Sequence, residues 1–415
     1  MIKILDKSAC CGCSSCAQRC PNESIEMIMD EEGFLYPKVN IDTCNNCGLC
    51  EDVCPTINKN LERHPLQCFA AKGKDTKLVD KSSSAGVFSL LAKRTIKNRG
   101  VIFGARFNSF WDVEHSYSET IVGIEDFQGS KYVQSRIGTC YKDAELFLKA
   151  GREVLFTGTP CQIAGLHKYL RKEYNNLICV DVICHGIPSP GVWRGYLKSI
   201  ISPKRRNNTV SSSFYSPLSE REAYQIKGIS FRDKRLGWKK YSFVLLSSRC
   251  TSRSEENSVS PSYKPLVCQK HYYNIFIRAF LHNFMLRYSC YNCPARKGRS
   301  GSDLLLGDYW GVAREYPSFI DSQGVSMVLA YSNKGIRILR ELDLKTIEIK
   351  YKDTLGNINI EFNESKPLLR DSFFQEYSCK GVKVLYSYCK AIEPNSAIEF
   401  CKNAIFKFKS ILSKK

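Results

Sequence analysis

Two runs of cysteine near the start of the chain have the spacing of iron-sulfur ligands. The first run places cysteines at x2, x2 and x3 intervals before a proline, and the second run repeats this spacing. In such a pair of runs, three thiolates of each run bind one 4Fe-4S cluster and the fourth binds the other. The spacing therefore predicts two ligand sets: Cys10, Cys13, Cys16 and Cys54 for one cluster, and Cys44, Cys47, Cys50 and Cys20 for the second.

Zinc is the alternative for these runs, because paired C-x2-C units also make tetrahedral zinc sites. A third cysteine at x2 and a closing Cys-Pro are superfluous for zinc, whereas a pair of cubane clusters requires both. Cys11 falls outside the spacing and is interpreted as a bystander thiol. The pattern predicts a bacterial-ferredoxin-like domain over residues 1–62, with two short strands around a turn between the runs.

A third metal site is predicted further along the chain. Cys290 and Cys293 form a C-x2-C pair before a proline and are the most ligand-like of the remaining cysteines. Cys140 and Cys179 lie in apolar surroundings and are interpreted as core thiols. The candidate ligands of the third site are Cys161, Cys184, Cys290 and Cys293.

Two strand-to-helix turns have the composition of anion sites. Hydroxyls and small residues precede a helix in KSSSAGVF, and a glycine and a Thr-Pro helix start follow a strand in FTGTPCQIAG. Backbone N–H groups and the helix dipole at such a turn can face a flavin or nucleotide phosphate, although Ser-rich and Thr-Pro helix starts are also common in proteins that bind nothing. The candidate residues are Ser82, Ser83, Ser84, Gly86, Gly158 and Thr159.

Two polar residues are candidates for acid-base chemistry. His185 adjoins Cys184 at the end of a strand, and Asp308 is expected just beyond the buried strand of GSDLLLGDYWGV. A lone histidine at a strand end more often has a structural role. Between them, residues 229–243 are expected to form a basic hairpin, which would hold nucleic acid by stacking or an anionic cofactor or substrate.

These residues must be positioned by a body of alternating strands and helices. Strands are predicted at 66–73, 100–107, 153–158 and 177–184, and helices at 84–98 and 160–172. The alternation predicts an α/β or α+β body behind the two-cluster domain. Three further segments are predicted: an N-terminal α/β domain at 66–150, a C-terminal domain at 151–332, and an extension at 333–415 with a basic amphipathic helix.

Composition separates an acidic head from a basic body. Residues 1–60 hold five Lys or Arg and nine Asp or Glu, which leaves 56 basic and 32 acidic residues for the remainder. The basic surplus suits an anionic partner, but it is also the ordinary charge of a solvated surface. No run approaches the roughly 18 apolar residues of a spanning helix, and the first residues lack a secretory signal. We expect a cytoplasmic protein whose 21 cysteines are reduced.

The amphipathic helix expected near the C-terminus carries an apolar stripe beside several lysines. Such a helix would either lie on the inner face of the membrane or dock on its own protein. Its stripe consists of Ile398, Cys401, Ile405, Phe408 and Leu412.

Seven stretches in this order resemble the family of coenzyme F420 hydrogenase/dehydrogenase beta subunits, in a version with an N-terminal two-cluster ferredoxin domain. They cover roughly residues 1–320 and are SSSAGVFSLLA, KYVQS, FTGTPCQIAGL, ICHGIPSPGVW, FRDKRLGW, YSCYNCP and SDLLLGDYWG. The resemblance implies FAD in the body, held by the turns at residues 82–86 and 158–160, and a nearby 4Fe-4S cluster on the four body cysteines. This chain has Ala85-Gly86 where the family usually shows a double glycine.

The resemblance favours an iron-sulfur flavoprotein oxidoreductase. Its ferredoxin head would exchange electrons with a redox partner or ferredoxin and pass them to the flavin. The substrate would be a small anion: coenzyme F420 or, in a bacterial polysaccharide-biosynthesis setting, a sugar-linked compound. One alternative is a non-catalytic electron-transfer subunit that feeds a partner enzyme. Another is a basic protein that binds membranes or nucleic acid, although nucleic acid is not the partner we expect.

Overall fold

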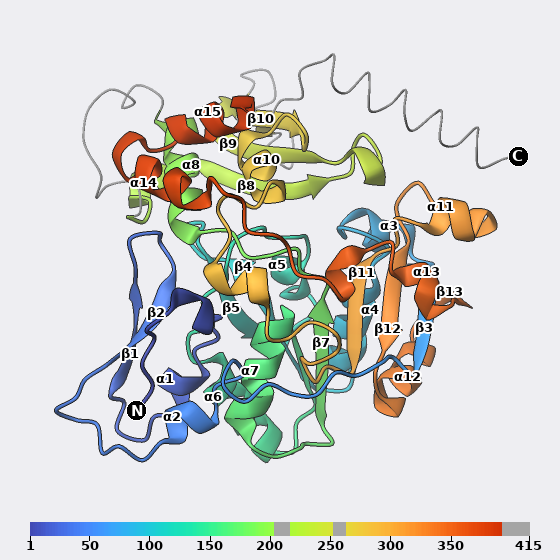
Figure 1. Cartoon of the computed structure of the whole chain (residues 1–415). Coiled ribbons are helices and arrows are strands. Elements are labelled where there is room, and N and C mark those ends of the chain that lie inside the picture. The colour runs from blue at the N-terminus through green and yellow to red at the C-terminus, as the bar shows by residue number, and fades with distance from the viewer. Residues whose placement is uncertain (203–215, 252–262, 392–415) are drawn as a thin grey trace, which may run out of the picture.

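The computed structural model describes residues 1–202, 216–251 and 263–391 of the 415-residue chain. Within these residues the strands form three sheets, one each of two, three and eight strands. We call residues 1–62 the head and the described residues after them the body. The head lies against one flank of the body (Figure 1). The predicted fold class, a ferredoxin-like domain followed by a mixed α/β body, is confirmed.

The head consists of two short helices and one hairpin. The predicted pair of strands is present, and the two strands run antiparallel with Ile25 opposite Val39. The hairpin turn extends away from the two helices toward the body (Figure 1). The bounds are α1 (Ser15–Arg19), β1 (Ile25–Met29), β2 (Leu35–Val39) and α2 (Leu49–Asp52).

The body is built on the eight-stranded sheet, whose order is β13-β3-β12-β11-β7-β6-β4-β5. Neighbours β4, β6, β7 and β11 run parallel, so their carboxyl ends share one edge, where ligands of α/β sheets usually bind. The four predicted body strands are confirmed to within two residues. The bounds are β3 (Gln67–Gly73), β4 (Val101–Phe107), β5 (Val113–Ser118), β6 (Val154–Gly158), β7 (Leu177–Val182), β11 (Leu304–Asp308), β12 (Ser326–Ala330) and β13 (Leu344–Glu348).

Helices cover both faces of this sheet. Ile102 and Leu155 point into a core under α4, α5 and α12, whereas their neighbours Phe103 and Phe156 point into a core under α6 and α7. This alternation is the period of two that a strand imposes, and burial on both faces explains the nearly continuous apolar strands. The bounds are α4 (Val87–Lys97), α5 (Ile124–Phe127), α6 (Cys140–Lys149), α7 (Pro160–Leu170) and α12 (Asn333–Arg340).

One sheet therefore draws strands from all three predicted body segments, because β3 lies in 66–150, β11 in 151–332 and β13 in 333–415. The segment boundaries stay predictions.

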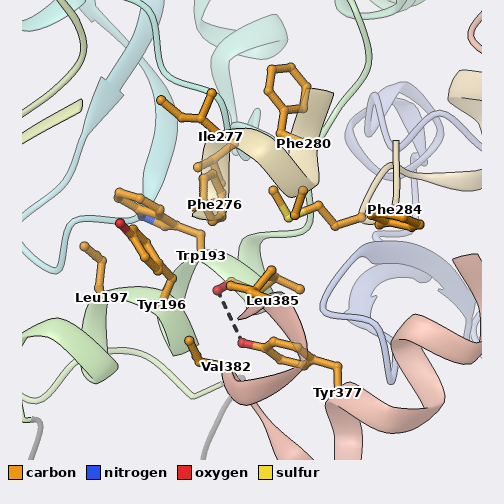
Figure 2. Packing of buried hydrophobic residues seen from close by; sticks show 14 of the residues in the cluster. Trp193, Tyr196, Leu197, Phe276, Ile277, Phe280, Phe284, Tyr377, Val382 and Leu385 are labelled. Carbon is orange, nitrogen blue, oxygen red and sulfur yellow. Dashed lines mark hydrogen bonds between the residues drawn. The ribbon is translucent and has the colours of Figure 1, made fainter. Parts of the chain in front are cut away.

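The three-stranded sheet and four helices enclose an aromatic core. Trp193 and Tyr196 of α8 pack on Phe276 of α10, with ring centroids 5.2 and 5.3 Å apart. The Tyr377 hydroxyl donates to the carbonyl oxygen of Val192 at 3.4 Å, and Figure 2 draws this bond as a dashed line from Tyr377. The bounds are α8 (Pro190–Ile201), β8 (Ile226–Asp233), β9 (Ser242–Thr251), β10 (Tyr263–Lys270), α10 (Ile275–Leu281), α14 (Arg370–Lys380) and α15 (Lys383–Ala391). Strands β8 and β9 are the predicted basic hairpin.

The remaining elements are single turns. They are η1 (Lys7–Ala9), α3 (Thr76–Asp80), α9 (Glu220–Tyr224), η4 (Trp238–Lys240), η5 (Tyr288–Asn292), α11 (Val312–Glu315), η6 (Pro317–Phe319), α13 (Tyr351–Thr354) and η7 (Ile358–Ile360). The amphipathic helix predicted at 398–412 lies outside the described residues. Among those described, no helix has the length and apolar character needed to cross a membrane.

Candidate functional site

The second cysteine run folds into an exposed loop that closes around a small cavity. The cavity measures about 20 Å³ and is lined by the predicted second ligand set, Cys20, Cys44, Cys47 and Cys50. Two backbone N–H groups point at its sulfurs, from Ile2 to Cys50 and from Ser24 to Cys20, both at 3.3 Å. Such N–H···S contacts stabilise the negative charge of cluster thiolates.

The first run has the same backbone as the second. Gly12 and Ser14 have φ of 72° and 64°, and the equivalent Asn46 and Gly48 have φ of 55° and 76°. Left-handed residues at the same two offsets turn the three thiols of each run toward one side. Burial, and then the proximity of Cys10 and Cys54, raise the pKa of the Cys16 thiol. The crossed ligand sets are therefore compatible with the geometry and stay predictions.

In the body, the turn after β6 fixes the first of the four predicted ligands. Thr159 caps α7, and a capping box joins its backbone N–H to the Gln162 side chain at 3.0 Å. Pro160 occupies the first helical turn, where its missing N–H is tolerated. This cap holds Cys161 at the carboxyl edge of the sheet, with its Sγ 3.3 Å from the Thr159 hydroxyl.

The other three body cysteines come from two loops that pair with each other. Cys184 follows β7. In the loop after it, the carbonyl of Ile187 accepts a hydrogen bond from the Arg287 N–H at 2.9 Å. In return, the Ile187 N–H donates to Cys290 Sγ at 3.3 Å. Cys293 closes the single turn η5 that begins beside Arg287.

All four body cysteines line one cavity of about 30 Å³. Arg287 and Arg296 line it as well, and both side chains are buried. The Nε atom of Arg296 has no hydrogen-bond partner there. Four thiols beside two buried cations, one with an unsatisfied donor, form a donor set that fits an anionic iron-sulfur cluster.

The four body thiols of this cavity are held protonated without metal. Burial raises the pKa of Cys290 to about 12 and raises that of Cys184 further. Cluster binding would therefore release protons. In the described ranges no three His, Cys, Asp or Glu side chains converge closely enough to hold a single metal ion. A cubane makes no such demand, because its thiolates bind four separate iron corners.

Cys11 lies in this body cavity, although the spacing marked it as a bystander. Its side chain is 5% exposed and lines the cavity with the four body cysteines. Hydrogen bonds from Cys13 and Cys161 hold the pKa of Cys11 well below its usual value. The sequence carried one signal for it: the equivalent position in the second run is Asn45 rather than cysteine.

The head and body are joined by two buried arginines that the sequence did not indicate. Arg287 donates to the carbonyl oxygens of Cys10 at 2.7 Å and Leu35 at 2.9 Å. Arg370 binds both carboxylate oxygens of Glu32, at 2.7 and 2.5 Å, and neither partner is more than 8% exposed. The head is therefore fastened to the body at a cluster loop and at its hairpin turn.

The serine turn before α4 is tied to the basic hairpin. The Ser82 hydroxyl donates to the Leu78 carbonyl at 2.9 Å, and Ser83 Oγ accepts from the Ser130 N–H at 2.8 Å. Lys234 of the hairpin donates to the carbonyls of Val79 and Ser84 at 2.7 and 3.3 Å. All three serine hydroxyls of the turn bond to protein, and Lys234 donates to a third carbonyl, that of Gln323, at 3.0 Å. An anion at this turn would therefore meet the first N–H groups of α4, and anion binding here stays a prediction.

The second anion candidate, residues 158–160, belongs with the cysteine cavity. The Thr159 hydroxyl lies within reach of Cys161 and Gln162. Behind it, Gln162 donates to Ser135 Oγ at 2.8 Å, and that hydroxyl lies 2.9 Å from His115 Nδ1. Burial lowers the pKa of His115 to about 4, so this network is neutral and holds the turn in place. Flavin binding by Gly158 and Thr159 stays a prediction.

Asp308 is the last residue of β11 rather than a residue beyond it. It accepts from Trp238 Nε1 at 2.9 Å and pairs with Arg232 of β8. Arg232 is 8% exposed, lies over the rings of Tyr241 and Trp310, and keeps Nε and Nη2 without partners. A buried guanidinium with two unused donors fits a planar anionic group.

His185 lies beside the cysteine cavity. Its Nδ1 is 3.1 Å from Glu364, and its ring packs edge-on against Phe280. Its Nε2 is buried without a partner. Burial lowers its pKa. These contacts fix the ring and leave one nitrogen for a ligand or proton.

Two family models match the chain. Residues 9–58 match the 4Fe-4S dicluster domain, and residues 151–354 match the C terminus of the coenzyme F420 hydrogenase/dehydrogenase beta subunit.

Among curated proteins, a subunit of the F420H2 dehydrogenase of Methanosarcina mazei is 25% identical over 205 residues, which are 45% of this chain and 57% of that protein. Coenzyme F420-dependent sulfite reductase of Methanocaldococcus jannaschii is 28% identical over 171 residues, 40% of this chain and 26% of the reductase. An uncharacterized ferredoxin from the same organism is 41% identical over 58 residues, 14% of this chain and 87% of the ferredoxin. The chain thus spans little more than half of the dehydrogenase protein it matches.

Among solved structures, the F420-reducing NiFe hydrogenase complex from Methanosarcina barkeri contains a similar chain. The alignment covers 72% of this chain and 90% of that one, with a TM-score of 0.44 and 15% identity.

Proposed function

Because the chain belongs to the family of coenzyme F420 hydrogenase/dehydrogenase beta subunits and carries an N-terminal 4Fe-4S dicluster domain, we propose that it is an iron-sulfur flavoprotein oxidoreductase. Its head exchanges single electrons with a redox partner, and its body holds a third cluster and a flavin. The substrate is a small anion, either coenzyme F420 or a sugar-linked compound.

The observation that carries this proposal is the contact between the first cysteine loop and the body cavity. Cys11 and Cys161 lie in one cavity, and the Ser15 hydroxyl of the same loop donates to the Gly165 carbonyl of α7 at 2.8 Å. Cys47 of the second loop is exposed. A redox partner therefore docks at the second loop. Electrons pass from the second loop through the first loop to the body.

The third cluster is held by Cys161, Cys184, Cys290 and Cys293. Their thiols come from three loops at the carboxyl edge of the sheet and share the cavity with Arg287 and Arg296. The two arginines offset the negative charge of the thiolates.

The flavin is held where the serine turn, Lys234 and Arg232 meet. A bound flavin would convert single-electron transfer into transfer of an electron pair or hydride. Lys234, whose pKa burial lowers to about 8, fixes the turn through two carbonyls, and Arg232 offers two free donors to an anionic group. Gly86 has a φ of 81°, a left-handed conformation that suits glycine. This one glycine therefore makes the turn, although Ala85 stands where the family usually has another glycine.

Asp308 and His185 have different parts in this proposal. Asp308 is engaged by Arg232 and Trp238, so it positions the guanidinium rather than transferring a proton. His185 stands between Cys184 and Gly186, which line the cavity, keeps Nε2 without a partner, and is the residue we assign to proton delivery.

Anaerobic purification with iron, sulfide and flavin quantification tests the proposal. About twelve iron atoms and about one flavin per chain are expected, because each cubane holds four irons. Cys184→Ala should leave about eight irons. The matched control is Cys179→Ala, which removes a buried thiol of β7 outside the cavity and should keep twelve. Arg232→Ala should lower bound flavin, whereas Arg235→Ala, a more exposed neighbour, should not.

The same measurement separates the alternatives. Twelve irons without flavin would favour a non-catalytic electron-transfer subunit that feeds a partner enzyme. Eight irons per wild-type chain would contradict the proposed third cluster. With flavin bound, reduced coenzyme F420 and nucleotide-linked sugars can be compared as electron donors to the oxidised protein.

A further inference from the structure

The body cavity contains one thiol more than a 4Fe-4S cluster requires. Five cysteines line it, four from the body and Cys11 from the head. A cubane has four iron corners and takes one protein ligand at each. The fifth thiol is therefore either idle or an additional ligand.

The position of Cys11 within the first cysteine run is not that of a ligand of the head clusters. The two cysteine runs have matching backbone conformations, with left-handed residues at Gly12 and Asn46 and again at Ser14 and Gly48. When the two runs are aligned, Cys11 corresponds to Asn45, which is not a thiol. The second loop forms its cavity without one, so the first loop needs none either.

The backbone around Cys11 is held so that its side chain faces the body. Gln134 donates to the Cys11 carbonyl at 3.2 Å, and Arg287 donates to the Cys10 carbonyl at 2.7 Å. A Cβ on Gly12 would lie 2.7 Å from Gln134 and 2.9 Å from Arg287, so the loop lies directly on these two side chains. The first loop also lies directly on α7, the helix whose first turn carries Cys161. The Ser15 hydroxyl donates to the Gly165 carbonyl at 2.8 Å, and a Cβ on Gly165 would lie 2.8 Å from the Cβ of Cys13.

We propose that Cys11 and Cys161 are interchangeable ligands of one corner of the body cluster, an inference that rests on the third cluster of the proposed function. In the exchange, one iron–sulfur bond to Cys161 breaks and one to Cys11 forms. Cys11 binds as a thiolate and Cys161 leaves as a thiolate, so one ligand replaces another and no electrons are transferred. With Cys11 bound, the cluster joins the head to the body through a metal–ligand bond.

Iron counts on anaerobically reconstituted full-length protein test the exchange. Cys161→Ala and Cys11→Ala should each keep about twelve irons, and the double variant should fall to about eight. Cys184→Ala is the control for a corner with no spare thiol and should fall to eight alone. The electron paramagnetic resonance of reduced Cys161→Ala should still show three interacting clusters.

The outcomes separate this inference from the proposed function. Twelve irons in wild type but eight in Cys161→Ala would overturn the exchange and leave the third cluster standing. Eight irons in wild type would overturn both. If Cys161→Ala lost the head clusters as well, the same count on Cys161→Val, which fills the space without supplying a ligand atom, would decide: twelve supports the exchange and eight overturns it.

Discussion

The two cysteine loops of the head have the same backbone and opposite surroundings. The first loop is covered by the body, with Cys11, Cys13 and Cys16 all buried, whereas Cys47 of the second loop is exposed. Ligand spacing and left-handed residues are equal in both. What differs is the body surface that each loop meets, since α7 and Arg287 bond to the first loop. A local motif thus determines a ligand loop, and tertiary packing determines which loop faces inward.

The largest expected effect comes from removing the contact that keeps the head in place. Arg370→Ala leaves the buried Glu32 carboxylate without its guanidinium, which should lower the free energy of unfolding by about 3–5 kcal/mol. Denaturant unfolding measures the loss, and proteolysis near residues 59–64 should become faster as the head detaches.

The matched control for that variant is Lys366→Ala. Lys366 pairs with Asp371 at 2.8 Å, but both side chains are well exposed, so the change should stay within about 1 kcal/mol. Equal losses in the two variants would contradict a head fastened through the buried pair.

A second pair of variants compares glycines in the two parts of the head. Gly33 in the hairpin turn has φ of 86°, and a Cβ there would lie 2.6 Å from the backbone of Gly191. Gly48 in the second loop has φ of 76° but nothing within 4 Å. We expect Gly48→Ala to cost about 1–2 kcal/mol from backbone strain alone, and Gly33→Ala about 1–3 kcal/mol more. Thermal or denaturant unfolding of both variants measures the difference, and equal costs would mean that the turn does not contact α8.

The network behind Cys161 should give a pH-dependent difference. Burial lowers the pKa of His115 from 6.5 to about 4, so its contribution to stability is present above pH 6.5 and is lost as the pH falls toward 4. Between pH 7.5 and pH 5 the wild type should lose about 2 kcal/mol more than His115→Gln. Unfolding curves at the two pH values provide the test. Parallel losses in both proteins would show that His115 is not buried as a neutral ring.

The smallest effect concerns thiol access in the cluster-free protein. Cys13 and Cys47 occupy equivalent places in the two loops, but only Cys47 is exposed. We expect an alkylating reagent to modify Cys47 at least about tenfold faster than Cys13, which corresponds to about 1.4 kcal/mol. Peptide mass spectrometry after short exposure gives both rates. Similar rates would place the first loop at the surface.

The sequence predicted the features that depend on nearby residues. The two cysteine loops, the strands around 66–73 and 177–184, and the fold class follow from spacing and hydrophobic period. The place of Cys11 in the body cavity was not predicted, because that cavity forms only when α7 and η5 approach the first loop. Arg287 and Arg370 were missed for the same reason: their partners Cys10 and Glu32 lie 277 and 338 positions away. No local pattern marks such a contact, since the sheet and the aromatic core bring the segments together.

The ion pair between Glu32 and Arg370 also has a consequence for biogenesis. Chains are synthesised from the N-terminus, and early domains fold first. Glu32 emerges from the ribosome 338 residues before its partner, so the hairpin turn of the nascent head cannot be fastened until α14 has been made. During that interval the cysteine loops of the head would be open to the cellular machinery that inserts iron and sulfide, and so, later, would the loops of the proposed third cluster. Closure by α14 and α15 is then a late step of maturation, after which Cys290 is buried and Cys161, Cys184 and Cys293 are only partly exposed.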